Sequence, residues 1–249
     1  MTDPTRHYLS ALFQPASVAI VGATEAPNKV GEVLVQNMLR AQYRGALFCV
    51  NPKYRNVHGV PCFRSVSALP QAVDLAVIAT PAATVPGVID ECGRKGVRAA
   101  VVITAGFSEA GPQGKVLERT LHENARRHGV RLIGPNCLGL LRPALGLNAA
   151  FARADALPGS LGLISQSGAV CAAMLDWALP QGIGFSSVVS MGGSVDVDFG
   201  EAIDYLANDA DTGHILLYIE GIHDARRFLS AVRAAARIKP VILMKVGRH

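Results

Sequence analysis

The sequence predicts an α/β protein of two domains, each built on a mostly parallel sheet. Five short apolar runs alternate with helix-length segments in the first part of the chain, and four more follow in the second. These runs are dense in Val, Ile, Leu and Ala without strict alternation, which is typical of strands buried on both faces of a parallel sheet. A chain of 249 residues, half of them hydrophobic, is long enough for two such domains.

The first series of elements predicts a doubly wound domain over residues 1–142. Strands are expected at 17–24, 46–53, 74–81, 98–106 and 131–136. Helices are expected at segments such as 30–42 and 112–128. In the second of these, Leu117, Leu121 and Ala125 repeat at helical spacing and Gly129 provides a stop. This βαβ order favours parallel strands with helices on both faces.

The second series predicts a second α/β domain over residues 160–249. Strands are expected at 160–167, 185–192, 214–221 and 240–247, with helices near 168–179, 197–208 and 224–237. The stretch 141–160 carries two prolines and weak periodicity, so a linker is expected over 143–159. Because the last strand is followed by only one or two residues, we expect this domain to be C-terminally incomplete and the chain to be part of a longer polypeptide.

Composition excludes several classes of protein. The net charge is +5, but the basic residues are scattered and aromatic residues make up only 6%, which disfavours nucleic acid and suits a small anionic ligand. The five cysteines are odd in number and never within four residues of each other, which argues against disulfides or a zinc site. Neither a signal peptide nor an apolar run of ~18 residues is present, so we expect a cytoplasmic protein that does not enter a membrane.

The first candidate site lies where the first strand meets the first helix. Gly22, Ala23 and Thr24 end the strand and Gly31 opens the helix. Helix N-termini at the carboxyl ends of such strands bind phosphate groups. The full Gly-x-Gly-x-x-Gly pattern is absent, so a plain strand-to-helix turn is the alternative.

Lys53 is the second candidate, because it follows the second strand, where NAD sites usually carry an acidic residue. A cation there suits a phosphorylated ribose or a pyrophosphate, which disfavours NAD and leaves NADP or coenzyme A. A solvated lysine is the alternative. Small residues end the next strands and would let a flat ligand approach the backbone, namely Thr80, Pro81, Ala82, Thr104, Ala105 and Gly106.

Three further features lie near strand ends. Ser165 and Ser167 are candidates for the N-cap of the following helix, and with Gly168 they could form an anion cradle. Glu220 ends a strongly apolar strand, so we expect it to be half-buried and to hold a cation or an imidazole, with a structural salt bridge as the alternative. Cys137 follows the fifth strand and is interpreted as a packed residue, because no histidine is near it in sequence.

Taken in order, the motifs resemble the NDP-forming acyl-CoA synthetase family, which is related to the succinyl-CoA synthetase α subunit. The matching segments cover nearly the whole chain. They are SVAIVGAT (17–24), NPKY (51–54), GVPCFRSVSALP (59–70), DLAVIATPA (74–82), VVITAGFSE (101–109), GPNCLGLL (134–141), GLISQSGAV (162–170), SMGGSVDVDFGEAIDYLANDADT (190–212), YIEG (218–221) and KPVILMKVGR (239–248).

The resemblance implies a Rossmann-like CoA-binding domain followed by a succinyl-CoA synthetase-like flavodoxin domain. Residues implied around CoA are Gly22, Ala23, Thr24, Asn28, Lys29, Val30, Gly31, Lys53, Thr80, Pro81, Ala82, Thr104, Ala105 and Gly106. Residues implied around phosphate are Asn136, Ser165, Gln166, Ser167, Gly168, Gly192 and Gly193. Glu220 would be the carboxylate that orients a phosphohistidine.

The implied reaction converts acyl-CoA, phosphate and ADP to acid, CoA and ATP, through an acyl phosphate and then a phosphohistidine. In the family that histidine lies in a Ser-His-Thr-Gly motif several residues after Lys-x-Gly-Arg. Here His249 follows Arg248 directly, too early and without the motif, so we expect the phosphohistidine to lie beyond this chain. The chain alone is expected to be inactive as a synthetase, forming neither a stable phosphoprotein nor ATP.

The resemblance also implies an ATP-grasp domain or β subunit that brings ATP or ADP and Mg, and an oligomer in the full-length protein. Two alternatives stay open. One is a CoA- or acyl-CoA-sensing module of a lysine acetyltransferase fusion, without synthetase activity. The other is an NADP-dependent oxidoreductase.

Overall fold

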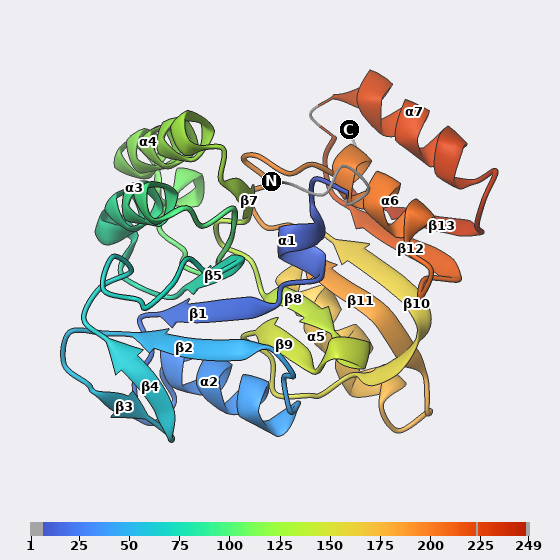
Figure 1. The fold of residues 1–249 in the computed structure, drawn as a ribbon. Helices are drawn as coiled ribbons and strands as arrows, with labels where there is room; N and C mark the ends of the chain where they lie inside the picture. Colours follow the sequence, from blue (N-terminus) through green and yellow to red (C-terminus); the bar gives the residue numbers. More distant parts are fainter. Residues whose placement is uncertain (1–6, 223, 248–249) are drawn as a thin grey trace.

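Two sheets, both largely parallel, organise the protein (Figure 1). The structure is a computed structural model, described for residues 7–222 and 224–247. The first sheet has the strand order β3-β4-β2-β1-β5-β6-β7, and every pairing except the β3–β4 hairpin is parallel. Its strands are β1 (Ser17–Val21), β2 (Ala46–Val50), β3 (Asn56–Val57), β4 (Val60–Phe63), β5 (Leu75–Ile78), β6 (Ala99–Val102) and β7 (Arg131–Ile133).

Helices cover both faces of this first sheet, as the fully apolar strands require. They are α1 (Ser10–Phe13), α2 (Val30–Arg40), α3 (Val85–Lys95) and α4 (Pro112–His128), and Figure 1 shows α3 and α4 together on the opposite side from α2. In β1, Ile20 packs into the core with Leu34 of α2, whereas Ala19 packs with Ile89 of α3. This two-sided burial confirms the predicted α/β class.

The second sheet has the order β13-β12-β10-β11-β8-β9. Its strands are β8 (Gly139–Arg142), β9 (Leu147–Ala150), β10 (Leu157–Ser165), β11 (Gly184–Ser190), β12 (His214–Ile219) and β13 (Val241–Lys245), and its helices are α5 (Gly168–Ala178), α6 (Phe199–Asn208) and α7 (Ala225–Ala235). β10 to β13 pair in parallel, whereas β8 pairs antiparallel with β11 and β9 pairs antiparallel with β8. Among the described residues, no helix has the length and apolarity needed to cross a membrane.

The expectation of a linker over 143–159 differs from the structure. β9 and the start of β10 lie inside that range, and β9 is buried along its whole length. The β8–β9 hairpin is anchored by the buried Arg142, whose guanidinium donates to Asp209 at 2.7 Å and to Asp211 at 3.1 Å. The stretch therefore belongs to the second sheet, through the antiparallel strand β9 and the first residues of β10. Its short strand and two prolines concealed this in the sequence.

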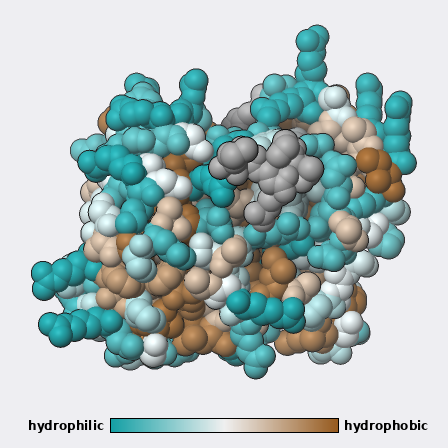
Figure 2. Space-filling view, in the orientation of Figure 1, coloured by the Kyte–Doolittle hydropathy of each residue, from teal (hydrophilic) through white to brown (hydrophobic). Residues whose placement is uncertain are grey.

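The two halves pack directly against each other. Asn37 of α2 donates its side-chain amide to the carbonyl oxygens of Ala150 at 2.8 Å and Ala152 at 2.9 Å. The rings of Phe13 and Tyr205 stack with centroids 4.0 Å apart. Figure 2 shows hydrophobic residues gathered in the lower centre of the molecule, where the strands of the two sheets approach each other in Figure 1. These contacts fix the strand ends of the first sheet opposite the start of α5.

Candidate functional site

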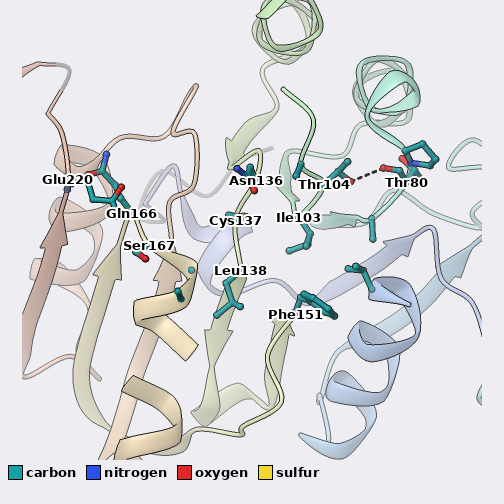
Figure 3. Close-up of a pocket in the computed structure, with 16 residues that line it drawn as sticks. Thr80, Ile103, Thr104, Asn136, Cys137, Leu138, Phe151, Gln166, Ser167 and Glu220 are labelled. Atoms are coloured by element: carbon teal, nitrogen blue, oxygen red, sulfur yellow. Dashed lines mark hydrogen bonds between the residues drawn. The ribbon is translucent and has the colours of Figure 1, made fainter. Parts of the chain in front are cut away.

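A cavity of about 810 Å³ lies between the two sheets (Figure 3). It opens at the carboxyl ends of β5 and β6, at the start of α5 and at the end of β12, the edge where parallel sheets bind ligands. Its lining consists of Val30, Ala79, Thr80, Pro81, Ile103, Thr104, Ala105, Asn136, Cys137, Leu138, Phe151, Gln166, Ser167, Gly168, Ala169 and Glu220. Residues predicted for CoA and residues predicted for phosphate thus meet in one cavity.

The rim on the first sheet is held by threonine hydroxyls. Thr104 Oγ1 donates to the carbonyl oxygen of Thr80 at 2.7 Å and ties the ends of β5 and β6 together. Thr80, Pro81, Thr104 and Ala105 border the cavity, but Ala82 and Gly106 do not. Instead these two face each other, since a Cβ on Gly106 would lie 3.1 Å from that of Ala82.

The turn from β1 to α2 requires glycine at two positions. Gly22 has a φ of +95°, a conformation that L side chains rarely adopt, and a Cβ on Gly31 would collide with the carbonyl oxygen of Gly22. The first turn of α2 therefore packs directly against the end of β1. Of the seven residues predicted here only Val30 reaches the cavity, because Ala23 is buried and Thr24 Oγ1 bonds the Tyr54 hydroxyl at 3.0 Å.

The remaining residues of this turn lie outside the main cavity. Lys29 is the exposed residue before α2 and makes no side-chain cap. Asn28 has a φ of +61° and borders a second, smaller cavity. They are therefore close to α2 but separate from the threonine rim.

Lys53 is exposed beyond the end of β2 and does not border the main cavity. Within the described residues, its ammonium has no hydrogen-bond or ion-pair partner. The neighbouring Asn51 accepts the Lys53 N–H at 2.9 Å and donates to the carbonyl oxygen of Ala23 at 2.8 Å. Asn51 therefore couples β2 to the first turn, a role that the sequence interpretation missed although an amide directly after a strand was visible.

The start of α5 presents unpaired donors to the cavity. Ser167 is the N-cap and accepts from Val170 N–H at 3.4 Å. In the described part of the chain, the N–H groups of Gly168 and Ala169 have no hydrogen-bond partner, and both residues line the cavity. Free N–H groups and the helix dipole at this end favour an anion.

Ser165 does not cap the helix, contrary to expectation. It is fully buried, donates its hydroxyl to the carbonyl oxygen of Ser167 at 2.9 Å and accepts the Ser167 N–H at 3.0 Å. Ser165 is the last residue of the central strand β10, and its hydroxyl stabilises the turn into α5 through these two bonds to the Ser167 backbone.

Gln166 positions the end of β12. Its side-chain oxygen accepts the N–H groups of Glu220 at 2.6 Å and Gly221 at 2.9 Å. The expectation that Glu220 is half-buried is wrong: β12 ends at Ile219, so the side chain lies beyond the sheet and is exposed beside the cavity. Within the described residues, its carboxylate has no hydrogen-bond or ion-pair partner.

Asn136 borders the cavity, whereas Gly192 and Gly193 do not. Asn136 has a φ of +56° and its N–H donates to the carbonyl oxygen of Thr104 at 2.9 Å. The Gly193 N–H donates to the carbonyl oxygen of Pro135 at 2.7 Å, so it is not available to a ligand. The two glycines therefore support the turn that carries Asn136.

Apolar side chains form the remaining wall. Burial raises the pKa of the Cys137 thiol to about 12, and its Sγ donates to the carbonyl oxygen of Val102 at 3.3 Å, which supports its interpretation as a packed residue. Ile103, Leu138 and Phe151 complete this wall. None of these three was predicted, and Phe151 lies in the stretch expected to be a linker.

Two family models match the chain. The CoA binding domain model matches residues 16–143, and the succinyl-CoA ligase like flavodoxin domain model matches residues 158–249. Among curated relatives, the ADP-forming acetate–CoA ligase I of Archaeoglobus fulgidus is 45% identical over 96% of this chain and 35% of its own length. The α subunit of ADP-forming acetate–CoA ligase I from Pyrococcus furiosus is 41% identical over 96% of this chain and 53% of its own.

A solved structure also resembles this chain over almost its whole length. Acetyl-coenzyme A synthetase 1 from Ca. Korarchaeum cryptofilum, in complex with phosphate and ADP, superposes with a TM-score of 0.93 at 40% identity, over 97% of this chain and 52% of its own. The chain thus spans about a third to a half of the length of these relatives.

Proposed function

The chain belongs to the CoA binding domain family, and from that premise we propose that it is the CoA-binding and ligase portion of an NDP-forming acyl-CoA synthetase. One observation carries the proposal. The strand ends of the CoA-binding half and the unpaired N–H groups of Gly168 and Ala169 border the same cavity. A thioester and a phosphate could therefore meet there.

The chemistry that suits this arrangement is phosphorolysis of a thioester. An oxygen of phosphate attacks the carbonyl carbon of acyl-CoA, the new C–O bond forms, the C–S bond breaks, and CoA leaves as the thiolate. Gly168 and Ala169 would hold the phosphate oxygens by hydrogen bonds, and the Thr80–Thr104 rim would support the chain of CoA. The product is an acyl phosphate.

Glu220 fits the next step by its position. Its carboxylate is exposed beside the cavity and has no hydrogen-bond or ion-pair partner among the described residues. A carboxylate there could orient an imidazole and stabilise its protonated form. We therefore propose that Glu220 positions the phosphohistidine of the complete enzyme.

For the complete enzyme we propose an acyl group as small as acetyl, because the two curated relatives described above are named for acetate. We also propose ADP, Mg and an ATP-grasp domain or β subunit as partners, in an oligomer. One of the relatives is itself named an α subunit.

Two measurements on this chain test the proposal. Calorimetry should detect binding of CoA but not of NAD, and equal affinity for both would overturn it. Arsenate should release free CoA from acetyl-CoA without any nucleotide, because acyl arsenates hydrolyse spontaneously and pull the first step forward. If CoA binds but arsenate releases none of it, the CoA-sensing module is the better assignment.

A further inference from the structure

A second cavity of about 370 Å³ lies beside the first, and residues of α2 and α5 line both cavities. Val30 of α2 and Ala169 of α5 line the main cavity, whereas Val33 and Ala172, three residues further on, line the second. Residues three apart share one face of a helix, so the same faces of α2 and α5 border both spaces. Asn28, before the start of α2, also borders the second one.

Phe151 is the residue that borders both cavities. Phe151 is 42% exposed, although Ala150 before it and Ala152 after it are buried. Figure 3 shows the ring lying between Leu138 and α2. Phe151 therefore lies where the two spaces adjoin.

The acyl group of a bound thioester would lie against the apolar wall of the main cavity, an argument that rests on the proposed function. Its carbonyl carbon must come within bonding reach of a phosphate held by Gly168 and Ala169. The apolar surface next to that point is Leu138, since a Cβ on Gly168 would lie 3.4 Å from the Leu138 Cβ. Phe151 continues the same apolar wall.

We propose that Phe151 limits the length of the acyl group that the site accepts. An acetyl group fits in the main cavity against Leu138 and Phe151. A longer chain would have to enter the second cavity, and the Phe151 ring closes that route. The second cavity suits methylene groups along Val33, Ala152 and Ala172, while Arg153 and Asp176 also border it.

The test is a set of calorimetric titrations in phosphate-free buffer with CoA, acetyl-CoA and hexanoyl-CoA. Wild-type chain should bind hexanoyl-CoA no more tightly than acetyl-CoA. In Phe151→Ala the ratio of hexanoyl-CoA affinity to acetyl-CoA affinity should rise by about fourfold for each methylene that enters the opened space, hence tenfold or more. Adding Ala172→Leu, which refills the second cavity, should remove most of that gain.

Leu157→Ala is the matched control, because Leu157 is 39% exposed and borders neither cavity. It should keep the wild-type preference. An unchanged ratio of hexanoyl-CoA to acetyl-CoA affinity in Phe151→Ala overturns the inference while CoA binding stands. If the wild-type chain does not bind CoA, both the proposed function and this inference are refuted. If Phe151→Ala unfolds, Phe151→Leu should give a smaller gain, and no gain overturns the inference equally.

Discussion

Replacing Gln166 tests how the anion site and Glu220 are held together. The Gln166 side-chain oxygen accepts two N–H groups, at 2.6 Å from Glu220 and 2.9 Å from Gly221. Each such bond contributes about 1 kcal/mol net, and these lie at a partly exposed surface, so Gln166→Ala should lower the free energy of unfolding by about 1–2 kcal/mol. Gln166→Glu keeps an acceptor oxygen at that position and should change the free energy of unfolding by less than about 0.5 kcal/mol.

Gln166→Ala and Gln166→Glu should behave differently in hydrogen exchange and in phosphate binding. Hydrogen exchange of the Glu220 and Gly221 amides should accelerate about tenfold in Gln166→Ala, because 1.4 kcal/mol is a factor of ten, and stay near the wild-type rate in Gln166→Glu. Phosphate binding should weaken in Gln166→Glu by about 1 kcal/mol, since a second carboxylate then faces the anion. Wild-type exchange rates and stability in Gln166→Ala would refute the positioning role.

Three further predictions concern CoA binding and the cavity wall. Lys53→Ala should weaken CoA by about 1–3 kcal/mol in calorimetry if the exposed ammonium bonds a phosphate, whereas the control Lys115→Ala on α4 should not, and equal effects would contradict the role of Lys53. Gly31→Ala should cost about 3 kcal/mol in denaturant unfolding because its Cβ would meet the carbonyl oxygen of Gly22, and wild-type stability would show that the turn can relax. Cys137 should resist iodoacetamide at pH 8 until the protein is unfolded, since its thiol pKa is about 12, and rapid labelling of the folded chain would contradict that burial.

The sequence was most informative where local chemistry and packing agree. The helix predicted at 112–128 has those bounds in the structure, because Pro112 starts it and Gly129 ends it with a φ of +67°. The predicted strands of the first sheet run past the structural ones; β6, for example, ends at Val102 rather than 106. Ile103, Thr104 and Ala105, which follow β6, extend the predicted run but lie beyond the strand and border the cavity.

Other features depend on contacts that no local pattern reveals. The β8–β9 hairpin is stabilised by the ion pairs of Arg142 with Asp209 and Asp211, more than sixty residues away in sequence. Phe151 follows that hairpin, so a stretch interpreted as a linker concealed its place in the cavity. The exposure of Glu220 depends on where β12 ends against Gln166, which the apolar run alone does not define.

The central claim is that an anion at the start of α5 and the thiol of CoA share one cavity. Crystals grown with CoA and arsenate, measured at the arsenic absorption edge, test it most directly. The claim predicts an arsenic peak within hydrogen-bonding reach of the Gly168 and Ala169 N–H groups, with the CoA sulfur in the same cavity. Arsenic bound elsewhere, with both N–H groups facing empty solvent beside a bound CoA, would contradict it.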